Sequence, residues 1–190
     1  NSLTKANNRP GGPFMPASPH RRMDAGAIGS IVAGYPLQLF ASNDARLINT
    51  AEFLFQECFF QGGFYQQISH SGINAYLTLH IAQVFLRAGD YRFFDLMNTI
   101  ASLASSTGQW PEAIHPRTKG GCMGDGQHLW AAAEWVQMIR NCFVLEEESE
   151  RKLILCSGIP GAWISEGAAI SFGPTLSSFG AVKIQIKGQN

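Results

Sequence analysis

The clearest hydrophobic pattern of the chain lies in segment 129–146, where apolar residues recur at steps of three and four. The apolar positions of this pattern are Leu129, Ala132, Ala133, Val136, Ile139 and Phe143. This spacing places them on one face of an α-helix. Asp125 precedes the segment as a candidate N-cap, and the acidic run 146–148 ends it. Because few polar residues interrupt the segment, we expect this helix to be covered on most sides.

Four earlier segments also carry helix signals. Asp24 can cap the first of them, and Pro36 kinks or ends it. Asn43 or Asp44 can cap the second, which stops at Gly62. The expected helices cover residues 25–36, 44–60, 72–88 and 91–105.

The spacing of these segments predicts the architecture. The long apolar helices start near residues 25, 72 and 126, a recurrence of about fifty residues that indicates repeated helical hairpins. Alternate helices of such an array share a direction, so the loops that precede these three helices open on one face. We therefore expect a mainly α fold that carries its polar chemistry at one end.

The pattern changes to short apolar or alternating runs near the C-terminus. Residues 152–156, 168–172 and 181–187 are separated by turn sequences, and the last run alternates cleanly between apolar and polar positions. These runs predict a small antiparallel sheet. The expected organisation is an extended arm at 1–20, a helical-hairpin segment at 21–148 and a β-rich segment at 149–190.

Composition narrows the function classes. The 190 residues carry 14 basic and 14 acidic side chains and a formal charge of +0, which argues against a nucleic-acid binder. No run reaches the roughly 18 apolar residues of a membrane span, and we expect no membrane partner. The four cysteines lack CxxC spacing, so buried thiols are favoured over disulfides, and no metal or other cofactor is expected. No signal peptide is recognisable and cytoplasm is the default location, although the first residue, Asn1, indicates a processed chain or a fragment.

The three loops expected on one face supply the candidate site residues. They are Arg22 and Asp24 in the first loop, His70 in the second, and Trp110, Glu112, His115 and Arg117 in the third. A Trp ring can stack on the apolar C–H face of a sugar, but it can equally lie at the edge of a core. The histidines are better suited to hydrogen bonding than to metal binding, since no metal-ligand spacing surrounds them.

The two acidic residues among these candidates also have plainer explanations. Asp24 can be a helix cap that pairs with a neighbouring arginine, and Glu112 can be an ordinary loop carboxylate. Glu134 lies between two tryptophans on the last expected helix, and it would need a partner if buried. A structural role is the simpler interpretation of Glu134.

Several stretches resemble the C-terminal part of six-hairpin (α/α)6-toroid glycosidases. They are WPEAIHPRTKGGCMGDGQHLWAAAEW, IVAGYPLQL, SGINAYLTLHIAQVFLRAGD and the tail ending SFGAVKIQI. The nearest likeness is to the glycogen-debranching and amylo-α-1,6-glucosidase group and its glucoamylase-like relatives. It covers the chain from about residue 22 onward and implies about half of a toroid.

The resemblance implies an inverting hydrolysis of α-linked glucosides or glucans by two carboxylic acids. It places the general base at Glu112, in the Trp-Pro-Glu sequence before the last helix. The general acid of the family lies several hairpins upstream, so an isolated chain is expected to lack it, and Asp24 is the other carboxylate on the same face. Whether the chain is an enzyme by itself is therefore left open.

Two functions from different classes follow. The first is the C-terminal portion of a glycoside hydrolase, with Glu112 as base and with Trp110, His115, Arg117, Arg22, His70 and Asp24 shaping the sugar site. The second is a non-catalytic carbohydrate-binding or scaffold module. Under either function the apolar flanks of the end helices predict self-association into a homo-oligomer.

Overall fold

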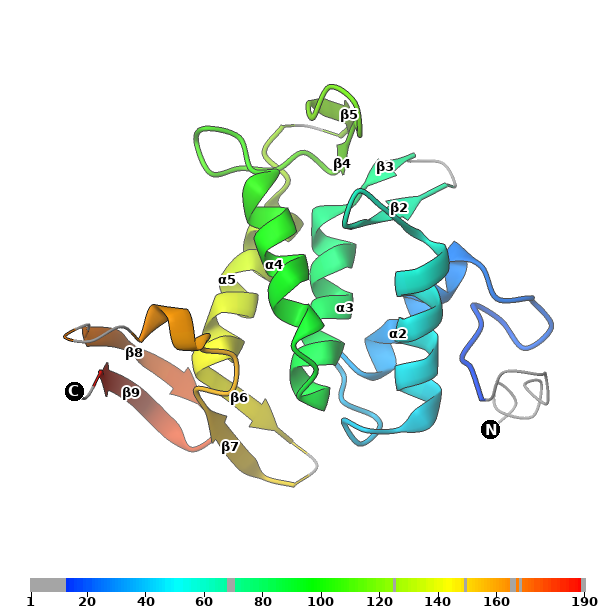
Figure 1. Ribbon diagram of the computed structural model, residues 1–190. Helices are drawn as coiled ribbons and strands as arrows, with labels where there is room; N and C mark the ends of the chain where they lie inside the picture. The colour runs from blue at the N-terminus through cyan, green and yellow to red at the C-terminus, as the bar shows by residue number, and fades with distance from the viewer. Residues whose placement is uncertain are drawn as a thin grey trace. The chain divides into compact units, whose positions relative to one another are not determined.

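The structure, a computed structural model, describes residues 13–67, 71–124, 126–148, 150–164, 167 and 169–188. The chain divides between Val136 and Gln137 into two compact units. Figure 1 shows the elements in chain order. The two units are described in turn.

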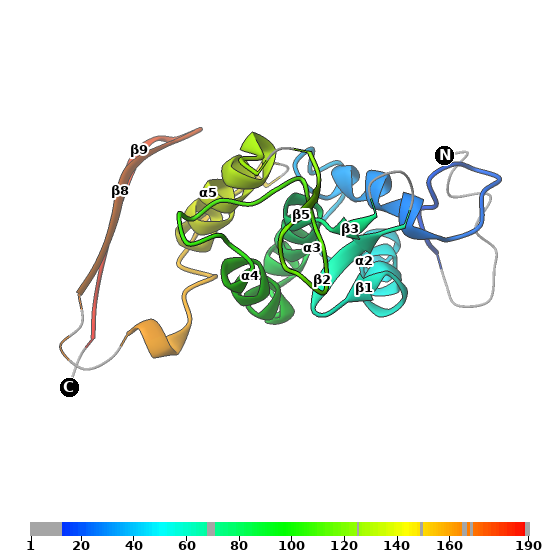
Figure 2. The ribbon, with the colours of Figure 1, turned by 90° about the horizontal axis from the view of Figure 1, so that it is seen from above.

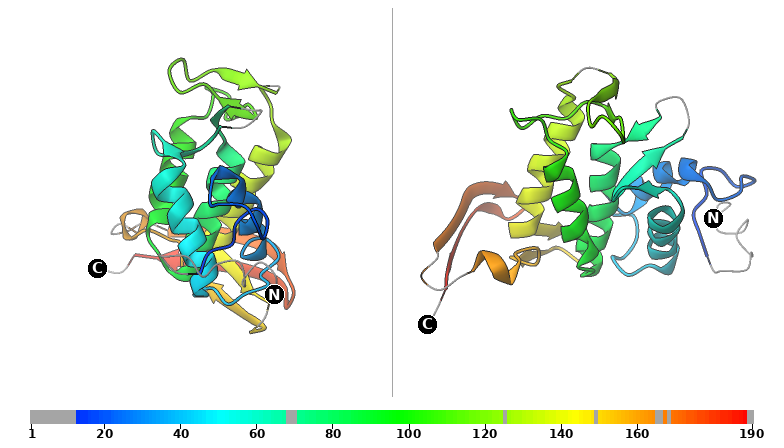
Figure 3. Two further views of the ribbon diagram at one scale, coloured as in Figure 1. Left: turned by 90° about the vertical axis from the view of Figure 1, so that its right-hand side faces the viewer. Right: turned by 45° about the horizontal axis from the view of Figure 1, so that its top comes forward.

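The first unit is built around helix α3, Ala75–Ala88. α3 packs against α4 (Arg92–Ser102), against α2 (Ala45–Glu57) and against the 3-10 helix η1 (Ala25–Ala33), and Figure 3 shows α2, α3 and α4 side by side. Its side chains form the centre of the core, where Leu79, Ile81 and Phe85 have no exposed surface. Such all-round burial explains why this helix carries so few polar residues.

Local sequence signals fix where these helices begin and end. The Asp44 carboxylate caps α2 by accepting the Arg46 N–H at 2.9 Å. Gly89 ends α3 in the left-handed conformation, with φ of 72°, which a glycine adopts without strain. Helix α5, Leu129–Phe143, starts in the first unit and crosses the division between the units.

A five-stranded antiparallel sheet lies at one end of these helices (Figure 1). Its order follows the chain: β1 Phe59–Phe60, β2 Gly63–Gln66, β3 Gly72–Ile73, β4 Ala113–Ile114 and β5 Gly121–Met123. In register, Tyr65 of β2 faces Ile73, and Ile73 faces Ile114 of β4. The pairing of β3 with β4 therefore joins the loop region before α3 to the loop region before α5.

The second unit contains the end of α5 and two separate hairpins. Strand β6 (Val144–Glu147) pairs with β7 (Lys152–Leu155), and β8 (Ala169–Ser177) pairs with β9 (Gly180–Lys187). A short 3-10 helix, η2 (Gly161–Trp163), lies between the hairpins in sequence. Figure 2 shows β8 and β9 as a long two-stranded ribbon.

The core of this second unit is small and aromatic. Phe143, Val144 and Ile184 are its buried members, and the Phe143 ring stacks on that of Phe172 with centroids 4.5 Å apart. Arg140 and Glu146 form an ion pair, and the Glu146 carboxylate also accepts the Ser178 N–H at 2.8 Å. Burial opposes ionisation of Glu146, but these hydrogen bonds outweigh it and lower the pKa of that carboxyl.

The expectation of a mainly α fold, with helical hairpins of about half a toroid, is wrong. The described residues form a mixed α/β fold, which contains a five-stranded sheet and two smaller sheets in addition to the helices. The strands of the larger sheet are two to four residues long, too short to show an alternating pattern in the sequence. Residues 144–146, expected to continue the last helix, belong to β6 because they pair with β7.

Candidate functional site

In the first expected site loop, the Asp24 side chain makes hydrogen bonds to neighbouring residues. One Asp24 carboxylate oxygen accepts the Gly26 N–H at 2.8 Å and so caps η1. The other accepts the Arg21 Nε–H at 2.8 Å. Arg22 is exposed beside them. The geometry of Asp24 is therefore that of a helix cap in an ion pair.

The second and third loops meet at a cavity of about 580 Å³. Gln67 lines it after β2, and His115 and Arg117 line it after β4. His70 lies outside the described residues. Burial, followed by the charges of Glu57 and Asp24, raises the pKa of the Cys58 thiol in the cavity wall to about 11. The second and third loops thus meet at this cavity, which neither Arg22 nor Asp24 of the first loop lines.

Trp110 takes no part in that cavity. It is only 4% exposed, and its indole N–H donates to the Ile100 carbonyl at 2.8 Å. Its ring lies 5.5 Å from that of Trp135, centroid to centroid. Trp110 therefore packs against the helices and offers little ring surface to a ligand.

Glu112 lies at the other end of β4 from His115 and is half-buried. It packs against Gly124, where an added Cβ would come within 2.7 Å of a Glu112 carboxylate oxygen. Gly124 also has a positive φ of 69°, so glycine suits this position on both counts. Burial and then the charge of Glu112 raise the pKa of the Tyr76 phenol.

A second group of polar residues surrounds Glu134, on the part of α5 that belongs to the first unit. The Tyr35 hydroxyl donates to one carboxylate oxygen of Glu134 at 2.8 Å. The Trp130 indole N–H donates to the other at 3.3 Å, and His80 Nε2 lies 3.1 Å from that same oxygen. One side chain from the segment after η1, one from α3 and one from α5 thus converge on one carboxylate.

Aromatic rings extend this group to Tyr76 and His128. The Trp130 ring stacks on that of Tyr76, with centroids 4.6 Å apart, and the His128 ring lies 5.1 Å from Tyr76. Trp130 is 50% exposed, so one part of this stack is open to ligands. We call the group the Trp130 cluster; its members are Tyr35, Tyr76, His80, His128, Trp130 and Glu134.

The charge state of the Trp130 cluster follows from its hydrogen bonds. Burial opposes ionisation of Glu134, but hydrogen bonds from His80, Tyr35 and Trp130 outweigh it and lower the pKa of the carboxyl. Burial, reinforced by Glu134, strongly raises the pKa of the Tyr35 phenol. At neutral pH the cluster therefore holds an ionised carboxylate bonded by a protonated phenol.

The sequence held a partial signal for this cluster. Glu134 between two tryptophans was recognisable as a carboxylate in need of a partner, but its partners come from distant segments. Tyr76 and His80 are separated by one helical turn on α3, which brings both onto one face. From the sequence alone, these two residues cannot be distinguished from the other members of an apolar helix.

Metal and disulfide chemistry have no support among the described residues. They contain no group of three or more His, Cys, Asp or Glu side chains arranged to hold a metal ion. All four cysteines are free. Cys58 and Cys142 are buried as expected, whereas Cys122 is exposed and Cys156 is partly exposed.

Comparisons with known proteins supply no family. No protein-family model matches the chain, and neither a curated protein nor a solved structure matches it. In the part of the chain that the structure describes, no helix is both long and apolar enough to cross a membrane. The function must therefore be argued from the arrangement of the site.

Proposed function

We propose that this chain is a portion of a glycoside hydrolase that acts on α-linked glucosides or glucans, and that the sugar binds at the Trp130 cluster. The observation that carries the proposal is the half-exposed Trp130 ring, stacked on Tyr76 and bonded to the ionised Glu134. The glycosidase-like sequence around Glu112 supports the same function.

The chemistry of the cluster suits a sugar. A pyranose has apolar C–H faces and a rim of hydroxyl groups. An aromatic ring held in place by a neighbouring ring offers a flat surface for one of those faces. Carboxylate and imidazole groups beside it can accept or donate hydrogen bonds to the rim, which fixes the orientation of the ligand.

Glu112 is the proposed general base. In an inverting hydrolysis one carboxylate removes a proton from the attacking water, and another carboxylic acid protonates the leaving oxygen. The charge of Glu112 contributes to the raised pKa of Tyr76, on which Trp130 stacks, and we propose that Glu112 reaches a sugar bound there. Since Asp24 is bonded as a helix cap, we assign the general acid to no residue of this chain.

Titration calorimetry with maltotriose tests the sugar site. Because ring stacking contributes about 0.5–1.5 kcal/mol, the Trp130→Ala variant is expected to bind several-fold to about tenfold more weakly than the unchanged chain. Trp163→Ala is the matched control, because Trp163 is also partly exposed, at 37%, but lies in the second unit. Equal losses in both variants, or binding that survives Trp130→Ala, would contradict the proposal.

The same titration separates the two function classes. A non-catalytic carbohydrate-binding module would bind maltotriose and depend on Trp130, but it would hydrolyse no glycoside, even one with a good leaving group. A glycosidase portion would show both binding and a Glu112-dependent hydrolysis of such a substrate.

A further inference from the structure

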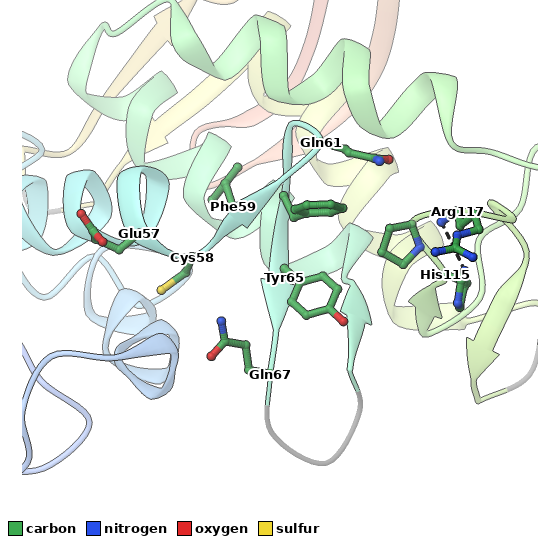
Figure 4. A pocket seen from close by; sticks show the side chains of 10 residues that line it. Glu57, Cys58, Phe59, Gln61, Tyr65, Gln67, His115 and Arg117 are labelled. Carbon is green, nitrogen blue, oxygen red and sulfur yellow. Dashed lines mark hydrogen bonds between the residues drawn. The ribbon is translucent and has the colours of Figure 1, made fainter.

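The cavity at the end of β4 is lined by other residues than those of the Trp130 cluster. It lies between the end of α2, the β1–β2 hairpin and the segment after β4, and Figure 4 shows the side chains that line it. No member of the Trp130 cluster lines it. Its volume, about 580 Å³, is in the range of roughly 300–1,000 Å³ found for small-molecule sites.

One end of this cavity is rich in hydrogen-bond donors. His115 Nδ1 accepts the backbone N–H groups of Arg117 and Thr118, each at 3.2 Å. Because Nδ1 is thereby an acceptor, the neutral ring carries its proton on Nε2. His115 thus has an N–H left to donate to a ligand in the cavity.

Arg117 adds a positive charge at the same end. Figure 4 shows its side chain beside His115. Among the described residues its guanidinium has no ion-pair partner, and the side chain is exposed. An arginine fork of this kind matches the two oxygens of a carboxylate.

The wall of the cavity combines aromatic rings with hydrogen-bond donors and acceptors. Phe60 is 50% exposed, and its ring meets Tyr65 edge to face with centroids 6.0 Å apart. The Gln67 amide can donate and accept, and Glu57 supplies a carboxylate at the far end. A flat apolar acid would leave these amide and carboxylate groups without partners, and this disfavours such a ligand.

From these contacts we infer that the cavity binds an acidic saccharide, a sugar that carries a carboxylate. Arg117 and His115 hold the carboxylate, and the Phe60 and Tyr65 rings contact a C–H face of the ring. Gln67 and Glu57 bond to its hydroxyl groups. This inference rests on the proposed carbohydrate function and adds that the chain recognises charged sugars at a second place.

Titration calorimetry with trigalacturonate and maltotriose tests the inference, because the two probes have the same number of rings and differ in charge. Trigalacturonate is expected to bind, and Arg117→Gln is expected to weaken it about tenfold to a hundredfold, as for a lost charge-assisted hydrogen bond. Arg117→Lys keeps the positive charge but loses the forked geometry of the guanidinium. Its affinity for trigalacturonate should therefore fall between those of the unchanged chain and Arg117→Gln. Lys183→Gln, which removes a positive charge from an exposed position of β9, should bind like the unchanged chain.

The outcomes separate this inference from the proposed function. Maltotriose binding that depends on Trp130, without trigalacturonate binding, overturns the acidic-sugar site and leaves the proposed function standing. Trigalacturonate binding that Arg117→Gln and Lys183→Gln weaken equally reflects net charge alone and also overturns it. If neither sugar binds, both proposals fail.

Discussion

At the scale of single residues, Glu134 shows how a largely buried carboxylate can be held ionised. One of its oxygens accepts from Tyr35, and the other accepts from Trp130 and lies within hydrogen-bond distance of His80. Its side chain is only 13% exposed, so loss of these bonds could not be replaced fully by water. The carboxylate therefore fixes the positions of the rings that surround it.

Glu134→Gln is expected to destabilise the chain by about 1.5–3 kcal/mol at neutral pH, the usual range for hydrogen bonds to a charged group. Urea unfolding measures the difference. Glu57→Gln is the control, since Glu57 is exposed at the end of α2 and its change should stay within about 0.5 kcal/mol.

The difference in unfolding free energy between the unchanged chain and Glu134→Gln should depend on pH in a defined direction. The pKa of Glu134 is lower in the folded chain, so its stabilisation is complete above the unfolded value, roughly pH 4.3. It is lost as pH falls through the lower, folded pKa. The difference between the unchanged chain and Glu134→Gln should thus shrink on acidification; a difference that grows would contradict this assignment.

Sequence reasoning located some site residues and missed the contacts that define their roles. His115 and Arg117 were expected in one site, and both line one cavity. Trp110 precedes Glu112 closely, yet its ring is buried, and spacing alone does not reveal which way a loop side chain points. Tyr76 was missed because its contacts with Trp130 and His128 join residues more than fifty positions apart.

At the scale of elements, the close packing of η1 on α2 depends on Gly34. An added Cβ at Gly34 would lie 2.5 Å from both Leu47 methyl carbons, and Leu47 has no exposed surface. The Gly34 carbonyl also accepts from the Arg87 guanidinium at 2.5 Å. There is little room for the backbone or for the leucine to move.

Gly34→Ala is accordingly expected to destabilise the chain by about 1–3 kcal/mol, the range for overpacking a buried site. Gly29→Ala is the matched control within η1, the 3-10 helix that Gly34 follows as C-cap, because nothing lies within 4 Å of a Cβ there. That variant should be neutral or slightly stabilised. Equal midpoints of thermal unfolding for the two variants would show that Leu47 does not restrict this contact.

The elements themselves were predicted unevenly. The positions of α2, α3, α4 and α5 follow from apolar periodicity and caps, and those of β7, β8 and β9 follow from short apolar or alternating runs. Strand β6 was expected to continue α5 and was missed. The strands of the larger sheet escaped because strands such as β3 and β4, two residues each, are defined by pairing with distant segments. The mixed α/β class could therefore not be read from local pattern.

At the scale of the whole molecule, the chemistry proposed for sugars belongs to the first unit. The Trp130 cluster, Glu112 and the cavity at His115 all come from residues up to Val136. Leu129 and Val136 are 81% and 67% exposed on this part of α5. Self-association of the chain through apolar surface stays a prediction.

Glu112 is proposed to activate water beside a sugar bound at the Trp130 cluster. α-Glucosyl fluoride tests it most directly, because fluoride leaves without the protonation that a general acid provides. The unchanged chain is expected to release fluoride, and Glu112→Gln should slow that release by about a hundredfold or more, the usual contribution of a general base. Maltotriose binding by the variant should be retained. Fluoride release at the same rate by both chains, or by neither, would contradict the role given to Glu112.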